Sequence, residues 1–133
     1  MKVLLIDDSL IVVARLMTML SDIQGIEIVG QAHNIGEGRA LFFELKPDVV
    51  ILDIQMPGGS GIDLLSHIKK DSPRTIVVML TNFPYQQYKN KCHEAGADHF
   101  FDKSEEFERI PDVLSGVLRN TVDDTSRKRN LNV

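Results

Sequence analysis

The sequence predicts an α/β fold, a doubly wound parallel sheet of five strands with helices on both faces. Five short runs rich in Val, Ile and Leu recur with their starts 22 to 27 residues apart, and stretches of helical periodicity separate them. Repeated alternation of strand and helix favours right-handed crossovers and a sheet covered on both sides. Five such units commonly take the strand order 2-1-3-4-5, in which strands 1 and 3 are neighbours.

The five strands are expected where the apolar runs occur. Several of these runs are nearly continuous in Val, Ile and Leu, which is typical of parallel strands that are buried on both faces. The expected strands are Lys2–Asp7, Ile26–Gln31, Asp48–Asp53, Thr75–Thr81 and Ala97–Phe101.

The first four helices are expected where apolar residues recur every three or four positions, and each apolar stripe should face the sheet. The stripes are Leu10, Val13, Met17 and Leu20; Ile35, Leu41 and Leu45; Ile62, Leu65 and Ile68; and Tyr85, Tyr88, Cys92 and Ala95. Signals for helix starts agree with three of them. Asn34 lies three residues before Glu37, and Ser60 lies three residues before Asp63, as capping residues do. Pro84 suits a first helical turn.

The fifth helix is expected to begin at about Ile110, because Pro111 is tolerated in a first turn but not in a helix interior. Residues 104–109 then form a separate turn. No apolar stripe continues after Asn120, so the helix is expected to end there. We therefore expect one domain over residues 1–120 and a polar, flexible C-terminal tail or linker over residues 121–133.

Composition limits the classes of function. The formal charge is −4, from 15 Lys and Arg against 19 Asp and Glu, which argues against nucleic-acid binding by the whole domain. The single cysteine, Cys92, excludes an internal disulfide and a zinc site built on two or more cysteines. No apolar run approaches the roughly 18 residues of a membrane span. We expect a cytoplasmic protein with no membrane partner.

Polar side chains follow four of the expected strands. Asp7 and Asp8 follow strand 1, Asp53 ends strand 3, Thr81 ends strand 4 and Lys103 follows strand 5. The carboxyl ends of these strands share one edge of the sheet, so the side chains should converge on one pocket. Close carboxylates repel one another unless a cation lies between them, and Mg2+ prefers oxygen ligands. We therefore expect a Mg2+ site that can accept a phosphoryl group.

Several short motifs accompany these residues. In chain order they are Asp7-Asp8, Asp53, Met56-Pro57, Gly61, Thr81, Ala95-Gly96-Ala97 and Lys103. Over roughly Met1 to Asn120 the combination resembles the receiver domain of bacterial two-component response regulators, such as the chemotaxis receivers. The resemblance implies the flavodoxin-like strand order and a role as a phosphoprotein in signal transduction or a phosphorelay. It implies no enzyme in the usual sense, because receivers catalyse only their own phosphorylation and dephosphorylation.

The resemblance assigns the acidic residues to phosphoryl transfer. It implies that Asp53 is the phosphoacceptor and takes its phosphoryl group from a phosphohistidine on a partner kinase. It implies that Asp8 and Asp53 bind Mg2+ directly, together with the backbone carbonyl of Gln55, and that Asp7 acts through water.

The resemblance also implies a conformational switch. Thr81 and Lys103 would stabilise the phosphoryl oxygens, and Phe100 would follow Thr81 inward. Phe100 lacks the tyrosine hydroxyl often found at this position of receivers, so the switch should act through packing alone. The face expected to change is formed by the fourth helix, the fifth strand and the fifth helix, and Tyr85 and Tyr88 are candidates for its surface.

The expected partners follow from the same resemblance. They are a sensor histidine kinase or phosphotransfer protein and, as an open alternative, a second copy of the chain in a phosphorylation-dependent homodimer. The chain is either a stand-alone receiver or the N-terminal half of a DNA-binding regulator, so nucleic acid is a partner only through a separate output domain. Receivers often have proline after the lysine, whereas this chain has Lys103-Ser104, for which a trans peptide is expected.

Two other functions use similar folds or residues. A dehalogenase-type Mg2+-dependent phosphatase needs a second Asp two residues after its nucleophile, and position 55 is Gln. A flavin-binding domain needs a phosphate-binding loop after strand 1, where Asp7, Asp8 and Ser9 would repel a phosphate. A further hypothesis is that Phe83 and Gln55 shield the aspartyl phosphate from water and lengthen its lifetime.

Overall fold

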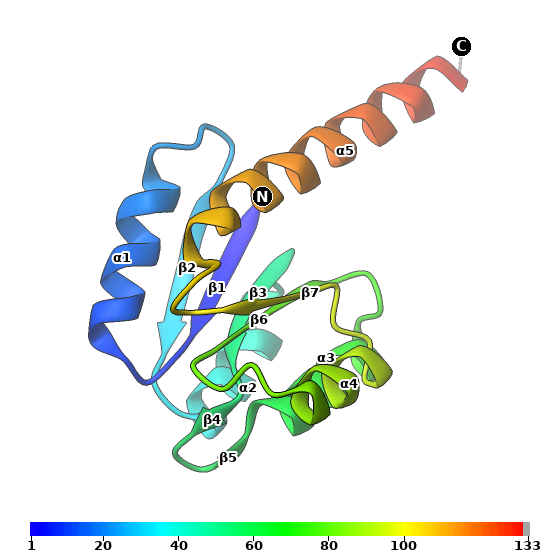
Figure 1. Ribbon diagram of the computed structural model, residues 1–133. Helices are drawn as coiled ribbons and strands as arrows, with labels where there is room; N and C mark the ends of the chain where they lie inside the picture. The colour runs from blue at the N-terminus through cyan, green and yellow to red at the C-terminus, as the bar shows by residue number, and fades with distance from the viewer. Residues whose placement is uncertain (132–133) are drawn as a thin grey trace.

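Five parallel strands form the central sheet in the order β2-β1-β3-β6-β7 (Figure 1). This computed structural model describes the backbone of residues 1–131 and the side chains of residues 1–120. The strands are β1 (Lys2–Ile6), β2 (Glu27–Ala32), β3 (Val49–Asp53), β6 (Ile76–Thr81) and β7 (His99–Asp102). If the five strands of this sheet are numbered 1 to 5 along the chain, their order is 2-1-3-4-5. The predicted fold class is therefore confirmed.

Burial along the strands follows their place in the sheet. Every residue of the central strand β3 is buried, and β1 and β6 are buried at all but their first residues. The edge strands β2 and β7 are only partly buried. The continuous apolar runs in the sequence therefore mark strands with neighbours on both edges and helices on both faces.

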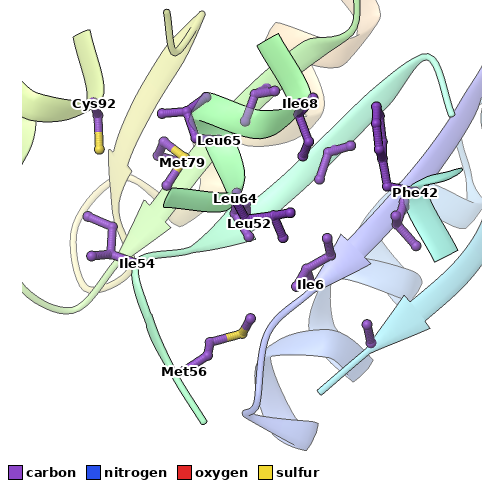
Figure 2. Close-up of a cluster of buried hydrophobic side chains, with 14 residues drawn as sticks. Ile6, Phe42, Leu52, Ile54, Met56, Leu64, Leu65, Ile68, Met79 and Cys92 are labelled. Atoms are coloured by element: carbon purple, nitrogen blue, oxygen red, sulfur yellow. The ribbon is translucent and has the colours of Figure 1, made fainter. Parts of the chain in front are cut away.

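Helices cover both faces of the sheet. The α-helices are α1 (Leu10–Ser21), α2 (Ile35–Leu45), α3 (Gly61–Asp71), α4 (Gln86–Glu94) and α5 (Ile110–Leu131). One apolar core joins α2, α3 and α4 to the sheet, and Figure 2 shows Phe42, Leu64 and Leu65 of these helices around Leu52 of β3. The other core joins α1 and α5 to the opposite face. Alternate residues of each strand supply the two cores.

Side-chain caps fix the starts of three helices. Ser9 Oγ accepts a hydrogen bond from Val12 N at 3.3 Å, Asn34 Oδ1 from Glu37 N at 2.8 Å and Ser60 Oγ from Ile62 N at 3.1 Å. Each bond satisfies a backbone N–H that has no partner inside the helix. Their positions confirm the helix starts that were expected from Asn34 and Ser60.

Two expectations about α4 are wrong. The helix begins at Gln86 with Tyr85 as its N-terminal flanking residue, so Pro84 lies before the helix and not in its first turn. Tyr85 is therefore outside the helical stripe and 55% exposed, whereas Cys92 of the same predicted stripe is buried. Proline commonly precedes a helix as well as opening one, because its fixed φ suits both positions.

The apolar stripe of α1 also differs from the expected one. Leu10 and Met17 are 69% and 39% exposed, and Leu16 is fully buried in their place. Almost every residue in the first two turns of α1 is apolar, so spacings of three and four fit more than one face of the helix. Periodicity alone therefore could not select the stripe Val13, Leu16 and Leu20, which packs on the sheet.

The region after β7 agrees with the sequence up to Asn120. A 3-10 helix, η1 (Phe107–Arg109), falls within the expected turn, and Pro111 is the second residue of α5. The backbone of α5 continues beyond the expected end at Asn120 to Leu131. The flexible character of residues 121–133 stays a prediction, since their side chains lie outside the described part of the chain.

A short hairpin after β3 was not predicted. It consists of β4 (Gln55–Met56) and β5 (Gly59–Ser60), which pair antiparallel through a turn with positive φ at Gly58 and Gly59. Strands of two residues carry no periodicity from which they could be recognised. Within the described residues, no helix has both the length and the apolar content needed to cross a membrane.

We predict that Leu16→Ala and Leu10→Ala will differ sharply in their effect on the free energy of unfolding. Leu16→Ala leaves a cavity in the core and should cost roughly 2–5 kcal/mol. Leu10→Ala, on the exposed face of the same helix, should stay within about 0.5 kcal/mol of the wild type. Urea denaturation measures both. Equal losses would contradict the orientation of α1.

Candidate functional site

The register of the sheet brings four strand ends to one edge. Ile6, the last residue of β1, pairs with Leu52, and Asp53 pairs with Leu80 of β6. Thr81, the last residue of β6, pairs with Asp102. The polar residues that end or follow these strands are therefore level with one another, as the sequence predicts.

Three carboxylates lie together at this edge. Asp7, Asp8 and Asp53 each present a carboxylate oxygen within 4.8 Å of the others. Asp7 and Asp53 are buried, and Asp8 is exposed. Two of the three charges are therefore held out of water, where their mutual repulsion is only weakly screened.

Lys103 provides the positive charge of the site. Its Nζ lies 2.8 Å from Asp7 Oδ2 and 3.0 Å from Asp53 Oδ2, and Lys103 itself is buried. The bond to Asp53 has good hydrogen-bond geometry, whereas Asp7 Oδ2 makes a close ion pair but no hydrogen bond of acceptable angles. One ammonium for three carboxylates leaves the cluster negative. A buried carboxylate oxygen with unused bonding capacity fits a hard divalent cation.

Burial shifts the ionisation of Asp53. Removal from water and, after it, the negative charge of Asp7 raise the pKa of the Asp53 carboxyl to about 6, although Lys103 and the backbone N–H of Ile54 lower it. Burial also lowers the pKa of Lys103, but its hydrogen bond and ion pairs with the two carboxylates more than offset this, and its pKa is raised. Lys103 therefore stays charged, and Asp53 is a more basic carboxylate than usual.

Thr81 is fully buried at the end of β6. Its Oγ1 accepts a hydrogen bond from the backbone N–H of Phe83 at 2.9 Å. The hydroxyl proton is not used in this bond, since here the oxygen is the acceptor. Thr81 can therefore donate to an oxygen that arrives at the strand edge. Phe100 of β7 is half-buried and packs against the core that contains Met79.

Gly61 fixes the backbone at the phosphoacceptor position predicted from the sequence. Its N–H donates to Ile54 O at 2.6 Å, and a Cβ placed on Gly61 would overlap the carbonyl oxygen of Asp53 and lie 2.9 Å from its carbonyl carbon. The start of α3 therefore touches the end of β3 backbone to backbone. The sequence motif contained Gly61, but nothing in the spacing indicated this contact.

Gln55 lies in β4, exposed, and donates from Nε2 to the hydroxyl of Tyr88 in α4 at 3.4 Å. This contact was not predicted, although Tyr88 was a candidate surface residue.

Of the predicted site residues, the structure gathers Asp7, Asp8, Asp53 and Lys103 in one cluster. The Lys103–Ser104 peptide is trans, as expected, since the described residues contain no cis peptide bond.

Comparison with known proteins gives a family. The profile described as the response regulator receiver domain matches residues 3–115. An uncharacterised response regulatory protein of Vibrio cholerae is 38% identical over 119 residues, which are 90% of this chain and 49% of that protein. The chain spans about half the length of the curated relatives it matches.

Solved structures give the same fold. The response regulator domain of Thermotoga maritima CheB has a TM-score of 0.78 at 28% identity, with 90% of this chain and 94% of that chain covered. A CheX–CheY complex of Borrelia burgdorferi with BeF3 and Mg2+ has a TM-score of 0.79 at 27% identity, with 87% of each chain covered.

We predict that Gly61→Ala will destabilise the protein and displace Asp53. Because the added methyl group meets backbone and not a flexible side chain, the loss should be at least about 2 kcal/mol in urea denaturation. Gly116→Ala in α5 is the matched control, since the nearest atom to its Cβ is 3.8 Å away. That variant should be neutral or more stable by up to about 1 kcal/mol. A neutral Gly61→Ala would refute the close approach.

We predict that Asp53→Asn will stabilise the metal-free protein in a pH-dependent manner. The folded-state pKa of Asp53 is raised to about 6, so its charged form opposes folding above that pH. At pH 8 in EDTA the variant should exceed the wild type by roughly 1–3 kcal/mol, and the advantage should shrink as the pH falls below about 6 and disappear only near the ordinary aspartate pKa of 3.8. Urea midpoints across this range measure it. The exposed Asp71→Asn should show no such trend.

Proposed function

The chain belongs to the response regulator receiver domain family of two-component signalling, and from this membership we propose that Asp53 is its phosphoacceptor. The donor is a phosphohistidine on a sensor histidine kinase or phosphotransfer protein. The observation that carries the proposal is the cluster in which Asp53 lies with two further carboxylates and is paired with Lys103.

Asp8 and Asp53 would hold a Mg2+ ion directly, with the backbone carbonyl of Gln55 as a further ligand and Asp7 acting through water. The clustering of carboxylate oxygens within 4.8 Å supports this choice. When bound, Mg2+ supplies charge neutralisation on the phosphoryl oxygens. Likeness to the Borrelia receiver, which was solved with Mg2+ and BeF3, also supports it.

In the proposed reaction a carboxylate oxygen of Asp53 attacks phosphorus, and the bond from phosphorus to the donor imidazole nitrogen breaks. The electron pair of that bond leaves with the imidazole, which takes a proton. Lys103 keeps its ion pair with Asp7 and turns its second interaction from Asp53 to a phosphoryl oxygen. Thr81 donates its hydroxyl proton to another phosphoryl oxygen. Both residues stabilise charge, and neither is a nucleophile.

Phosphorylation would also switch the protein's surface. It raises the negative charge at position 53 and adds strong acceptor oxygens, which draw the hydroxyl of Thr81 inward. Phe100 of β7 pairs with Met79 of β6, two residues before Thr81, and would follow Thr81 by packing. The face built by α4, β7 and α5 then changes shape, with Tyr85 and Tyr88 on or near its surface.

The receiver unit is assigned to residues 1–120, and residues 121–133 act as a tail or a linker. The partner that reads the switched face is an output domain or protein, or a second copy in a phosphorylation-dependent homodimer. Nucleic acid is reached only through a separate output domain. The dehalogenase-type phosphatase lacks support, because Gln55 occupies the position where it needs a second Asp.

We predict that acetyl phosphate with Mg2+ will add one phosphoryl group to the wild-type protein, detected by intact mass. Asp53→Asn should lower the incorporation at least about 100-fold, because the nucleophilic oxygen is lost. Asp71→Asn, an exposed carboxylate far from Asp53 along the chain, should retain full incorporation. Lys103→Ala should still show a rise of Tm with Mg2+ but a much slower incorporation. Equal phosphorylation of Asp53→Asn and wild type would refute the assignment.

A further inference from the structure

Lys103, which pairs with both buried carboxylates, is the first residue after strand β7. Its backbone N–H donates to Thr81 O of β6 at 2.8 Å, so this segment is tied to the sheet on one side. Among the described residues β7 is an outermost strand of that sheet. Successive N–H groups of a strand point to opposite edges, so the N–H of Asp102 faces the open edge. The backbone position of Lys103 therefore depends on what holds Asp102 there.

Glu106 provides that partner. Its Oε1 accepts a hydrogen bond from Asp102 N at 3.2 Å, and its own N–H donates to Asp102 O at 2.9 Å. Asp102 Oδ1 also accepts a hydrogen bond from Ser104 N at 2.9 Å. Two bonds between the same pair of residues thus close the turn that contains Lys103. No proline restrains this turn, since Ser104 follows Lys103 in a trans peptide.

The turn is also anchored on the side that follows Glu106. Phe107 is 4% exposed and belongs to the core that α1 and α5 cover, and the guanidinium of Arg15 lies 4.3 Å from its ring centroid. Arg109 donates from its backbone N–H to Glu106 O at 2.9 Å, and its Nη1 lies 2.6 Å from Glu106 Oε2. Glu106 is therefore fixed by neighbours other than Asp102, so its carboxylate can hold Asp102 in place.

We propose that Glu106 is a positioning residue for phosphoryl transfer, because it holds the turn from which the Lys103 ammonium reaches the site. The inference rests on the proposed function, in which Lys103 stabilises a phosphoryl oxygen on Asp53. Lys103 Nζ lies 2.8 Å from Asp7 Oδ2 and 3.0 Å from Asp53 Oδ2, so its position is closely defined. A displacement of about 1 Å in such a group can slow a reaction roughly 100-fold. Glu106 acts through the backbone of Lys103 and touches no reacting atom.

The test is the initial rate of phosphorylation by acetyl phosphate with Mg2+, followed by intact mass. With this donor an oxygen of Asp53 attacks phosphorus, and acetate leaves with the electron pair of the broken bond. Glu106→Ala should lower the rate about tenfold, which corresponds to about 1.4 kcal/mol, near the net worth of a hydrogen bond to a charged group. Glu106→Gln keeps an acceptor oxygen for Asp102 N and should stay within about twofold of the wild type. The ion pair that it loses is with Arg109, whose side chain is 65% exposed, and such pairs contribute little.

Glu105→Ala is the matched control. Glu105 is exposed in the same turn, and its side chain has no hydrogen bond or ion pair within the part of the chain that the structure describes. Its rate should equal that of the wild type.

Two further measurements separate positioning from a general loss of stability. In metal-free protein the amide proton of Asp102 should exchange with solvent faster in Glu106→Ala than in Glu105→Ala, as measured by NMR. In a Lys103→Ala background, Glu106→Ala should lower the phosphorylation rate no further, because its effect passes through the Lys103 ammonium.

A Glu106→Ala protein that is phosphorylated at the wild-type rate would overturn the inference and leave phosphorylation of Asp53 intact. Unchanged exchange of the Asp102 amide, or a further loss of rate in the Lys103→Ala background, would also overturn it. So would a Glu106→Gln rate as low as that of Glu106→Ala, because the bond to Asp102 would then not carry the effect. If the wild type takes up no phosphate, the proposed function and this inference fall together.

Discussion

Lys103 compensates two buried carboxylates that would otherwise repel each other, and the rest of the site depends on this pairing. Its Nζ is within 3.0 Å of oxygens from both Asp7 and Asp53, residues contributed by different strands. One ammonium cannot neutralise three carboxylates, so the cluster retains a negative charge and a raised pKa at Asp53. The same imbalance costs stability, and the proposed Mg2+ ion would relieve it.

Much of the fold was predictable because its signals are local or follow from covalent topology. The apolar runs located all five strands of the main sheet, and Asn34 and Ser60 marked two helix starts. The prediction of which face of α1 is buried was wrong, because a helix that is apolar on nearly all sides has no unique apolar stripe. The β4–β5 hairpin was missed because its pairing depends on two glycines with positive φ, and its strands are too short to show alternation.

The site was predictable to the level of the strand ends. Parallel strands in a known order must bring their carboxyl ends together, so the proximity of Asp7, Asp8, Asp53 and Lys103 required no knowledge of side-chain packing. The hydrogen bond between Gln55 and Tyr88 could not be predicted, because it depends on how the short strand β4 lies against the start of α4. The spacing of residues in the sequence does not predict side-chain rotamers or the packing of short segments.

The backbone contact at Gly61 bears on protein engineering. Moving the acidic residues and the lysine into another α/β scaffold would reproduce the charges, but not the approach of a helix start to the peptide unit of the central aspartate. A successful graft would need to carry the whole segment from Asp53 to Gly61, with its hairpin, as one piece. Transplanted chemistry is therefore constrained here by main-chain shape as much as by side-chain identity.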